Sequence, residues 1–391
     1  MSGLLSALLL RRAGWEVDVY ERVGSELSGR GAGIVAQQEL IGRLRSLGLA
    51  ADDLGVQITT RKILDADGRL TSEIACPQVL TAWERVYRLL RDAFPPERYH
   101  RGRELVRFTQ DAQAVLAYFS DGDMVAADLL VGADGIRSTV RRQCAPEIMP
   151  QYAGYTAWRA LLAESDIPQG AHRDLFEFMA FGLPPGEQFL VYPVAGPEND
   201  LRVGHRRANV VWYRPADEGT KLQWLLTDES GHTHAISIPP PLIRREAIAE
   251  MRADAERLLA PQFREIVRLI DEPILQPIYD LESPRMAFGR VAVLGDAAFV
   301  ARPHVAAGVS KAADDAAALA QALQAESGVE NALKRFEAAR LRENFSIIER
   351  ARHLGAYLQA TRTEAEQARA GRHSTDQAVI TETAVLDFLY A

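Results

Sequence analysis

An apolar strand that ends in Gly-Asp, followed by a loop and an alanine-rich helix, constrains the fold of this chain more than any other segment. Residues 291–294 read Val-Ala-Val-Leu, a run typical of a strand buried on both faces. Gly295 lets the backbone approach a partner closely, and Asp296 places a carboxylate where the strand ends. Pro303 and Gly308 interrupt the loop before the helix, whose first turn presents free backbone N–H groups. The segment therefore predicts an α/β fold with a polar ligand at the end of a strand.

A second junction of the same kind lies far upstream. Residues 129–133 form an apolar run, Asp134 and Gly135 form a tight turn, and Ser138 stands in the first turn of an expected helix. Ala-Asp-Gly alone is a common turn and carries little information. Two strand–turn–helix junctions in one chain, however, favour a single site to which both contribute.

The N-terminal residues match the later part of a dinucleotide-binding unit, which consists of a strand, a Gly-x-Gly-x-x-Gly turn and a helix. Gly3 corresponds to the last glycine, and residues 15–22 correspond to the second strand. Glu21 stands where an acid is expected to accept hydrogen bonds from ribose hydroxyls, with Arg22 beside it. The first strand and the first two glycines are missing, so we expect them upstream of Met1 or lost by truncation.

Together these segments are similar to the flavin-binding fingerprints of the single-component FAD-dependent aromatic hydroxylases. The resemblance implies that Asp296 binds the ribityl chain of FAD, and that Asp134 lies near both FAD and the path of the nicotinamide cofactor. Arg30 and Gly31 belong to a glycine-rich loop that resembles the family segment beside the flavin, although a mobile surface loop is the alternative for Arg30. The FAD-binding residues expected from the resemblance are Gly3, Glu21, Arg22, Arg30, Gly31, Asp134, Gly295, Asp296, Pro303, Ala307 and Gly308.

The resemblance extends from Gly3 to about Leu358 and implies an α/β fold with three parts. These parts are a discontinuous Rossmann-like FAD-binding domain, a substrate domain with a mostly antiparallel sheet, and a C-terminal helical region. The expected ranges are 1–74, 98–150 and 275–330 for the FAD-binding domain, 75–97 and 151–274 for the substrate domain, and 331–391 for the C-terminal helices.

Three aromatic-rich strand patterns occupy residues 152–160, 188–194 and 208–215, between the two flavin-like junctions. Their alternation points one face of each strand at a core or a cavity. A sheet packed on its own helices would show the same pattern. Because the patterns lie between the two junctions, we favour a sheet that roofs a flat aromatic ligand, with Tyr192 and Tyr213 as candidates for orienting it.

Within the family, three short segments most resemble the hydroxypyridine hydroxylases: residues 152–159, 212–215 and 302–308. The resemblance implies that NADH or NADPH reduces FAD, and that O2 then forms a flavin hydroperoxide that hydroxylates an electron-rich ring. His304 is the first catalytic candidate, because an imidazole can draw a substrate hydroxyl toward its anion near neutral pH. The alternative is a histidine that only packs against the ring. The expected catalytic residues are His304 and Tyr213, and the expected substrate-binding residues are Tyr192, Tyr213 and His304.

Composition narrows the possible partners. The net charge of −8 and the lack of a basic stripe argue against nucleic acid. The only long apolar run near the N-terminus, residues 4–10, is too short to span a bilayer and predicts a buried helix. Two cysteines provide neither a disulfide framework nor a metal site, which suits the cytoplasm. An apolar stripe on the C-terminal amphipathic helices would serve a homodimer.

Two other functions remain open at this point. A flavoprotein reductase or dehydrogenase could use the same fold on a non-aromatic substrate, and it would oxidise NAD(P)H without substrate-dependent O2 uptake. A descendant that has lost FAD could act as a ligand-binding protein, and it would be colourless when purified.

Overall fold

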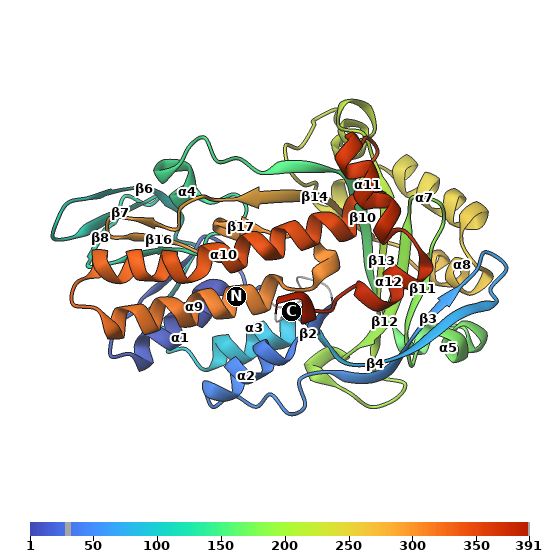
Figure 1. Cartoon of the computed structure of the whole chain (residues 1–391), viewed down its shortest axis with the longest axis horizontal. Helices are drawn as coiled ribbons and strands as arrows, with labels where there is room; N and C mark the ends of the chain where they lie inside the picture. The colour runs from blue at the N-terminus through green and yellow to red at the C-terminus, as the bar shows by residue number, and fades with distance from the viewer. Residues whose placement is uncertain (28–32, 390–391) are drawn as a thin grey trace.

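The computed structural model describes residues 1–27 and 33–389 of the 391-residue chain. Arg30 and Gly31 therefore lie outside the described residues. Figure 1 shows two parts side by side, one made of helices and small sheets and the other built on a large sheet with its own helices. Helix α10 (Val329–Gly355) runs along both parts.

Nine strands pair into the large sheet in the order β17-β14-β10-β13-β12-β11-β3-β4-β2. All neighbouring pairs are antiparallel except β11 with β3. Its strands are β2 (Gly33–Ala36), β3 (Val56–Leu64), β4 (Leu70–Ala82), β10 (Gln151–Ala163), β11 (Met179–Gly182), β12 (Gln188–Val194), β13 (Arg207–Pro215), β14 (Ile274–Glu282) and β17 (Phe299–Val300). The three aromatic-rich patterns are thus β10, β12 and β13, at the centre of this sheet.

Smaller sheets and helices make up the rest of the described chain. The remaining strands are β1 (Val19–Glu21), β5 (Tyr99–Arg101), β6 (Leu105–Gln110), β7 (Val115–Phe119), β8 (Met124–Ala127), β9 (Leu130–Gly132), β15 (Ala287–Phe288) and β16 (Val291–Val293). The other helices are α1 (Ser2–Arg12), α2 (Gln38–Ser46), α3 (Trp83–Asp92), α4 (Thr139–Cys144), α5 (Gln169–Leu175), α6 (Gln223–Leu226), α7 (Arg245–Leu258), α8 (Pro261–Arg268), α9 (Gly308–Ala325), α11 (Glu364–His373) and α12 (Asp376–Glu382).

The two faces of the large sheet differ, because successive side chains of a strand point to opposite sides. Trp158 of β10 pairs with Trp212 of β13 on the face that packs against α5, α7 and α8. Tyr155 and Tyr213 lie on the other face, together with Tyr192 of β12. The aromatic alternation therefore separates a helix-covered core from a tyrosine-lined inner face.

Short parallel strands lie in the part of the fold that holds the two strand–turn–helix junctions. β9 is parallel to β16, with Gly132 opposite Val293, and β1 is parallel to β5. The two pairs belong to separate sheets among the described residues. Because parallel strands end at the same edge, the turns after β9 and β16 come together. Helix α1, largely buried as expected from residues 4–10, packs against α9 beside them.

The expected α/β fold with an antiparallel-rich sheet is confirmed. The pairing of β3 with β11 places the hairpin of residues 56–74 in the same sheet as the expected substrate domain. Strand β14, from the range assigned to the FAD-binding domain, extends that sheet at the other edge. The three-part division of the chain stays a prediction.

The C-terminal helices close one side of the inner face. Figure 1 shows α11 and α12 against the large sheet, and Ile380 and Ala384 belong to the same apolar cluster as Tyr155. Arg61 of β3 is buried, and its Nη1 donates a hydrogen bond of 2.8 Å to the carbonyl of Ile380 at the end of α12. The last described segment is thus part of the core around the tyrosines.

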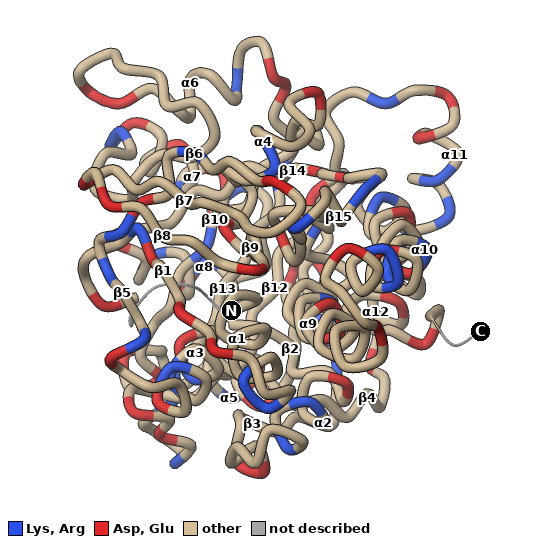
Figure 2. Tube along the Cα trace, turned by 90° about the vertical axis from the view of Figure 1, so that its left-hand side faces the viewer, with Lys and Arg blue, Asp and Glu red and all other residues tan. Residues whose placement is uncertain are grey.

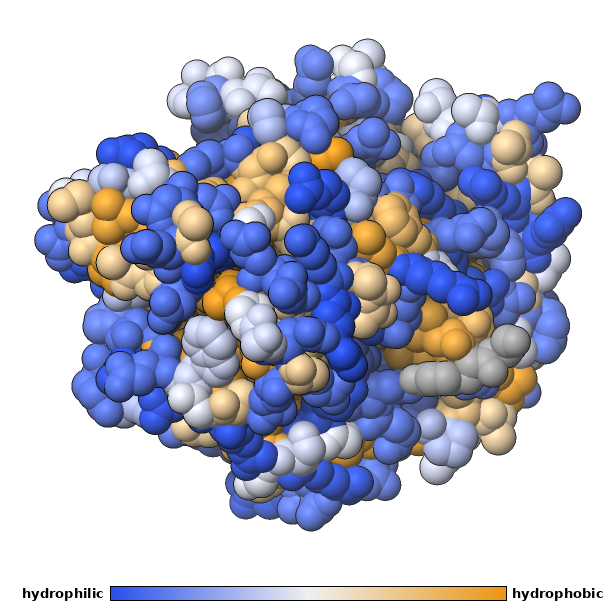
Figure 3. All heavy atoms as spheres, turned by 60° about the vertical axis from the view of Figure 1, so that its left-hand side comes forward, coloured by the Kyte–Doolittle hydropathy of each residue, from blue (hydrophilic) through white to orange (hydrophobic). Residues whose placement is uncertain are grey.

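Charged residues of both signs are dispersed over the trace in Figure 2. The face shown in Figure 3 is mostly hydrophilic, with apolar patches separated by polar atoms. Among residues 1–27 and 33–389, none of the helices combines the length and apolar character needed to cross a bilayer.

Candidate active site

The two strand–turn–helix junctions meet at the start of α1. The N–H of Leu294 donates to the carbonyl of Gly132, which links the ends of β16 and β9 at 3.1 Å. Gly295 has a positive φ of 62°, and a Cβ there would lie 2.6 Å from Oγ of Ser2. A Cβ on Gly3 would lie 3.5 Å from that of Ala133. Gly295, predicted to allow close approach, and Gly3, matched to the last glycine of the dinucleotide-binding turn, therefore both lie where the three segments touch.

A buried arginine that the sequence pattern did not single out ties the two junctions together. Arg141 donates through Nη1 to the carbonyl of Ala297 at 2.8 Å and through Nη2 to that of Ile136 at 2.7 Å. One carbonyl follows Asp296 and the other follows Asp134 in the chain. Burial lowers the pKa of Arg141, and the charge of Asp134 opposes that shift. In the sequence, the only feature that could have indicated this role of Arg141 is its position in the helix that follows an Asp-Gly turn.

Asp296 is the strongest candidate ligand for a polyol. The described residues make no hydrogen bond to its carboxylate, which is accessible to solvent although protein surrounds it closely. Burial raises the pKa of Asp296, and the charge of Lys311 opposes that shift. Lys311 is itself buried, and its Nζ has no hydrogen-bond partner in the described part of the chain. Nζ of Lys311 forms a long ion pair with Oδ2 of Asp315, at 3.9 Å. A free acceptor beside an ammonium group whose hydrogen bonds are not used by the described residues fits the hydroxyls and polar edge of FAD.

Asp134 has a local task. Its Oδ2 accepts hydrogen bonds from the N–H groups of Thr139, at 2.7 Å, and Val140, at 3.2 Å, and so caps α4. Glu21 likewise accepts the N–H of Val23 at 2.9 Å, and Arg22 is exposed. Roles of these residues in binding a cofactor stay predictions.

The loop from Asp296 to α9 ends in an uncapped helix. Ala306 has a left-handed φ of 51°, Ala307 is buried, and α9 begins at Gly308. No side chain of the described residues caps the first turn, so its N–H groups are available for a ligand. Asp315 holds the helix in place, because its Oδ2 accepts the N–H of Gly295 at 3.1 Å.

His304 lies between this loop and the tyrosine-lined face. Its Nε2 is 2.9 Å from Oη of Tyr155, and its ring centroid is 4.4 Å from that of Tyr213. Burial lowers the pKa of His304 to about 3, and the charges of Arg302 and Arg159 contribute. The ring is therefore neutral at neutral pH, so the expectation that it takes up a proton there does not fit this environment. It can still orient a substrate hydroxyl by a hydrogen bond.

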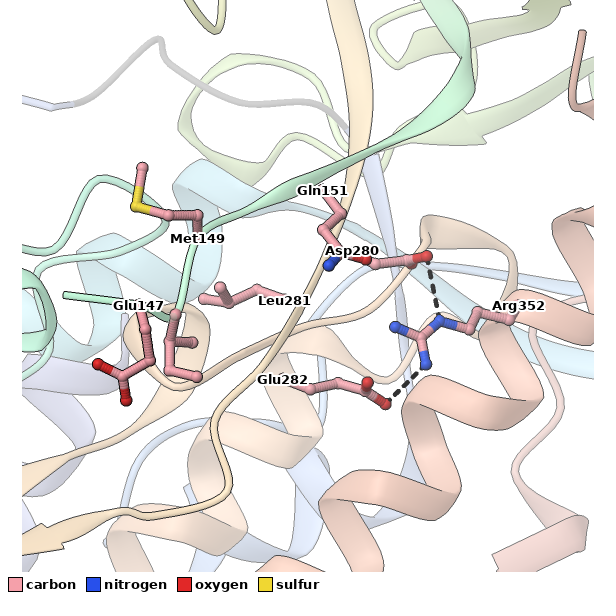
Figure 4. Close-up of a pocket in the computed structure, with 8 residues that line it drawn as sticks. Glu147, Met149, Gln151, Asp280, Leu281, Glu282 and Arg352 are labelled. Carbon is pink, nitrogen blue, oxygen red and sulfur yellow. Dashed lines mark hydrogen bonds and ion pairs between the residues drawn. The ribbon is translucent and has the colours of Figure 1, made fainter. Parts of the chain in front are cut away.

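An ion-pair cluster anchors the His304 loop from behind. Arg302 donates to Asp280 of β14 through Nε, at 3.0 and 3.2 Å, and through Nη2, at 2.8 Å, and its Nη1 donates to Gln359 at 3.0 Å. Figure 4 shows the outer side of the cluster, where Arg352 of α10 contacts Asp280 and Glu282 beside a hollow of about 160 Å³. Strand β14 and helix α10 thus both hold the residue two positions before His304.

Two further contacts press on the same loop. The N–H of Ala384 donates to the carbonyl of His304 at 2.7 Å, so the chain after α12 supports the loop directly. A Cβ on Gly355 would lie 2.5 Å from Oη of Tyr155 and 3.1 Å from Cδ2 of His304. The sequence pattern singled out neither residue, because both act across long chain separations.

The predicted substrate residues divide into two groups. Tyr213 lies against His304, and burial raises its pKa, so it stays a phenol. Tyr192 instead donates its hydroxyl to the carbonyl of Gly33 at 3.0 Å, while the N–H of Gly33 donates to Asn209 at 2.7 Å. A Cβ on Gly33 would lie within 2.9 Å of Tyr192, Val194 and Asn209. Tyr192 therefore anchors the chain just after the glycine-rich loop, and its hydroxyl is already in use.

Known proteins share this architecture. A family model described as FAD binding domain-like matches residues 152–280, which include the centre of the large sheet. The 2,6-dihydroxypyridine 3-monooxygenase of Paenarthrobacter nicotinovorans is 34% identical over 360 residues, covering 92% of this chain and 89% of that protein. The 3-amino-4-hydroxybenzoate 2-monooxygenase of Streptomyces cremeus is 30% identical over 371 residues, covering 90% and 84%. The solved structure of 2,6-dihydroxypyridine-3-hydroxylase from Arthrobacter nicotinovorans matches with a TM-score of 0.86 and 33% identity, covering 92% of this chain and 90% of that one.

Proposed function

Because the chain belongs to the family of FAD-dependent aromatic hydroxylases, we propose that it uses NADH or NADPH and O2 to hydroxylate a hydroxypyridine-type ring. The observation that carries this proposal is the convergence of Asp296, the uncapped start of α9 and His304 beside a buried tyrosine-lined sheet face. The substrate class is supported by the relative that acts on 2,6-dihydroxypyridine.

Asp296 would accept hydrogen bonds from the ribityl hydroxyls, and the first turn of α9 would stabilise negative charge on the pyrimidine ring. Gly3 and Gly295 let the segments around the cofactor site pack closely against one another, and Arg141 would hold both turns beside the cofactor. When bound, FAD supplies the electron transfer from NAD(P)H and the activation of O2 that ring hydroxylation needs. The buried tyrosines exclude water from the ring that is hydroxylated.

His304 and Tyr213 hold the ring hydroxyl of the substrate in this proposal. His304 is neutral and fixed through Tyr155, so it acts by orientation and hydrogen bonding. The two free cysteines support a cytoplasmic location. A homodimer is part of the proposal, and the molar mass of the purified protein in solution tests it.

Substrate-stimulated turnover tests the function. Purified protein loaded with FAD is mixed with NADH or NADPH and a panel of hydroxylated pyridines and benzoates. We expect a hydroxypyridine to stimulate both NAD(P)H oxidation and O2 uptake, with a product that gains one oxygen atom. Stimulated NAD(P)H oxidation without oxygen insertion would indicate the reductase, and protein that binds no flavin would indicate a ligand-binding descendant.

A further inference from the structure

Arg159, on the inner face of the large sheet, has no acidic partner among the residues that the structure describes. Arg159 lies in β10 opposite Val211 of β13, and the alternation of the strand places it on the same face as Tyr155. It is partly buried. Throughout the described residues, no carboxylate lies within ion-pair distance of its guanidinium, and its Nε is buried without a hydrogen-bond acceptor.

Other buried arginines near this sheet are compensated. Arg206 pairs with Glu164 at 2.8 Å, Arg214 pairs with Asp254 at 2.7 Å, and Arg302 pairs with Asp280 at 2.8 Å. Within the described part of the chain Arg61 has no carboxylate partner, but its donors reach the side chain of Gln78 and a backbone carbonyl. A charged group with a buried, unmatched donor is costly unless a ligand provides the acceptor.

The charge of Arg159 acts on the candidate site itself. It lowers the pKa of Tyr213 and Tyr192, against the larger upward effect of burial, and it contributes to the low pKa of His304. A hydrogen bond between Arg159 and the Tyr213 hydroxyl adds to the effect on Tyr213, so the donor that remains unmatched is Nε. Arg159 therefore lies close to the three residues predicted to contact the substrate. The positive potential that it creates there is not neutralised by an acid of the described chain.

We propose that Arg159 binds a negatively charged group of the ring substrate, either a carboxylate or an ionised ring hydroxyl, and thereby selects anionic rings. This inference rests on the proposed function and adds the charge of the substrate to it. When the group is a hydroxyl, its proton passes to bulk water on binding. The ring then carries extra electron density, which favours attack by an electrophilic oxygen.

Two matched ligands separate charge from shape. 6-Hydroxynicotinate carries a carboxylate where 6-hydroxynicotinamide carries an uncharged amide of similar shape. The affinity of each ligand for the FAD-loaded protein is measured from the change in flavin absorbance. We expect the wild-type protein to bind the carboxylate about tenfold more tightly or better. Arg159→Met should lose this preference while keeping its affinity for the amide, and Arg159→Lys should recover part of it.

The control is Arg173→Met, which removes the same charge from a side chain that is 77% exposed on α5. It should keep the wild-type preference. A third ligand, 2,6-dihydroxypyridine, addresses the ionised hydroxyl: its affinity for the wild-type protein should rise as pH crosses the ionisation of the ligand, and this rise should disappear in Arg159→Met. Should Arg159→Met fail to retain FAD, Arg159→Gln provides the same comparison.

Unchanged preference for the carboxylate in these variants, together with an unchanged pH profile for the dihydroxypyridine, would overturn the role of Arg159. Equal affinity of the wild-type protein for the carboxylate and the amide would exclude a carboxylate as the group that Arg159 binds. The pH profile for 2,6-dihydroxypyridine then decides whether Arg159 binds an ionised ring hydroxyl. Failure of every ring compound to stimulate O2 uptake contradicts the proposed function instead. The binding measurements do not depend on turnover, so the two failures are distinguishable.

Discussion

Oη of Tyr155 lies 2.9 Å from Nε2 of His304, and both side chains are buried. Burial raises the pKa of Tyr155 well above its usual value, so the phenol keeps its proton. The 2.9 Å contact fits either tautomer of the neutral imidazole, and we infer the one in which the Tyr155 hydroxyl donates to Nε2 and the imidazole proton lies on Nδ1. In this tautomer His304 presents an N–H donor, which suits an anionic ring oxygen better than a neutral hydroxyl.

Tyr155→Phe is expected to retain FAD but to lower coupled hydroxylation about tenfold, because Nε2 loses its donor and the tautomer is no longer fixed. The measurement is the ratio of hydroxylated product to NAD(P)H consumed. Tyr357→Phe is the matched control, since the buried hydroxyl of Tyr357 has no hydrogen-bond partner among the residues that the structure describes. Equal coupling in the two variants would show that the hydroxyl of Tyr155 has no special role.

The low pKa of His304 predicts how stability depends on pH. The unfolded histidine binds a proton below about pH 6.5, whereas the folded one stays neutral down to about pH 3. Because the unfolded state binds more protons in this window, His304 reduces stability as pH falls, by about 1.4 kcal/mol per pH unit. Urea unfolding of the wild-type protein and of His304→Gln at about pH 7.5 and about pH 5.5, about one unit on either side of the unfolded pKa, measures this. A stability difference between the two proteins that does not change with pH contradicts the prediction.

Asp296→Ala is expected to weaken FAD binding about tenfold or more, because the ribityl hydroxyls lose a charged acceptor. The dissociation constant is measured by titrating the flavin-free protein with FAD. Asp67→Ala is the control, since it removes the same charge from a side chain that is 71% exposed in the turn between β3 and β4. Equal FAD affinity in both variants would remove Asp296 from the cofactor site.

Gly355→Ala should displace Tyr155, since the added Cβ would lie 2.5 Å from its hydroxyl oxygen. We expect a loss of about 1–3 kcal/mol in the free energy of unfolding and poorer coupling of hydroxylation. Gly371→Ala in α11 is the matched control, because a Cβ added there would meet no atom within 4 Å and alanine favours a helix. Thermal unfolding and product analysis of the two variants measure the difference.

The sequence predicted those parts of the site that local patterns encode. A strand, a glycine and a carboxylate in succession identify the turn at Asp296, and period-two aromatic residues identify the inner face that carries Tyr213. Residues that act across long separations left no such signal. Arg141 acts through its contact with Ala297, and Gly355 acts by leaving room for Tyr155. The pKa of His304 depends on its burial and on the charges of Arg302 and Arg159.

The contact between Ala384 and His304 has a consequence for how the enzyme is made. The ribosome synthesises the loop around His304 well before the residues that support it from the C-terminal side. A nascent chain therefore lacks this support for the His304 loop until Ala384 has been synthesised. Premature termination just before α12 would release a polypeptide that contains the turns at Asp134 and Asp296 but lacks the hydrogen bond from Ala384 to the carbonyl of His304.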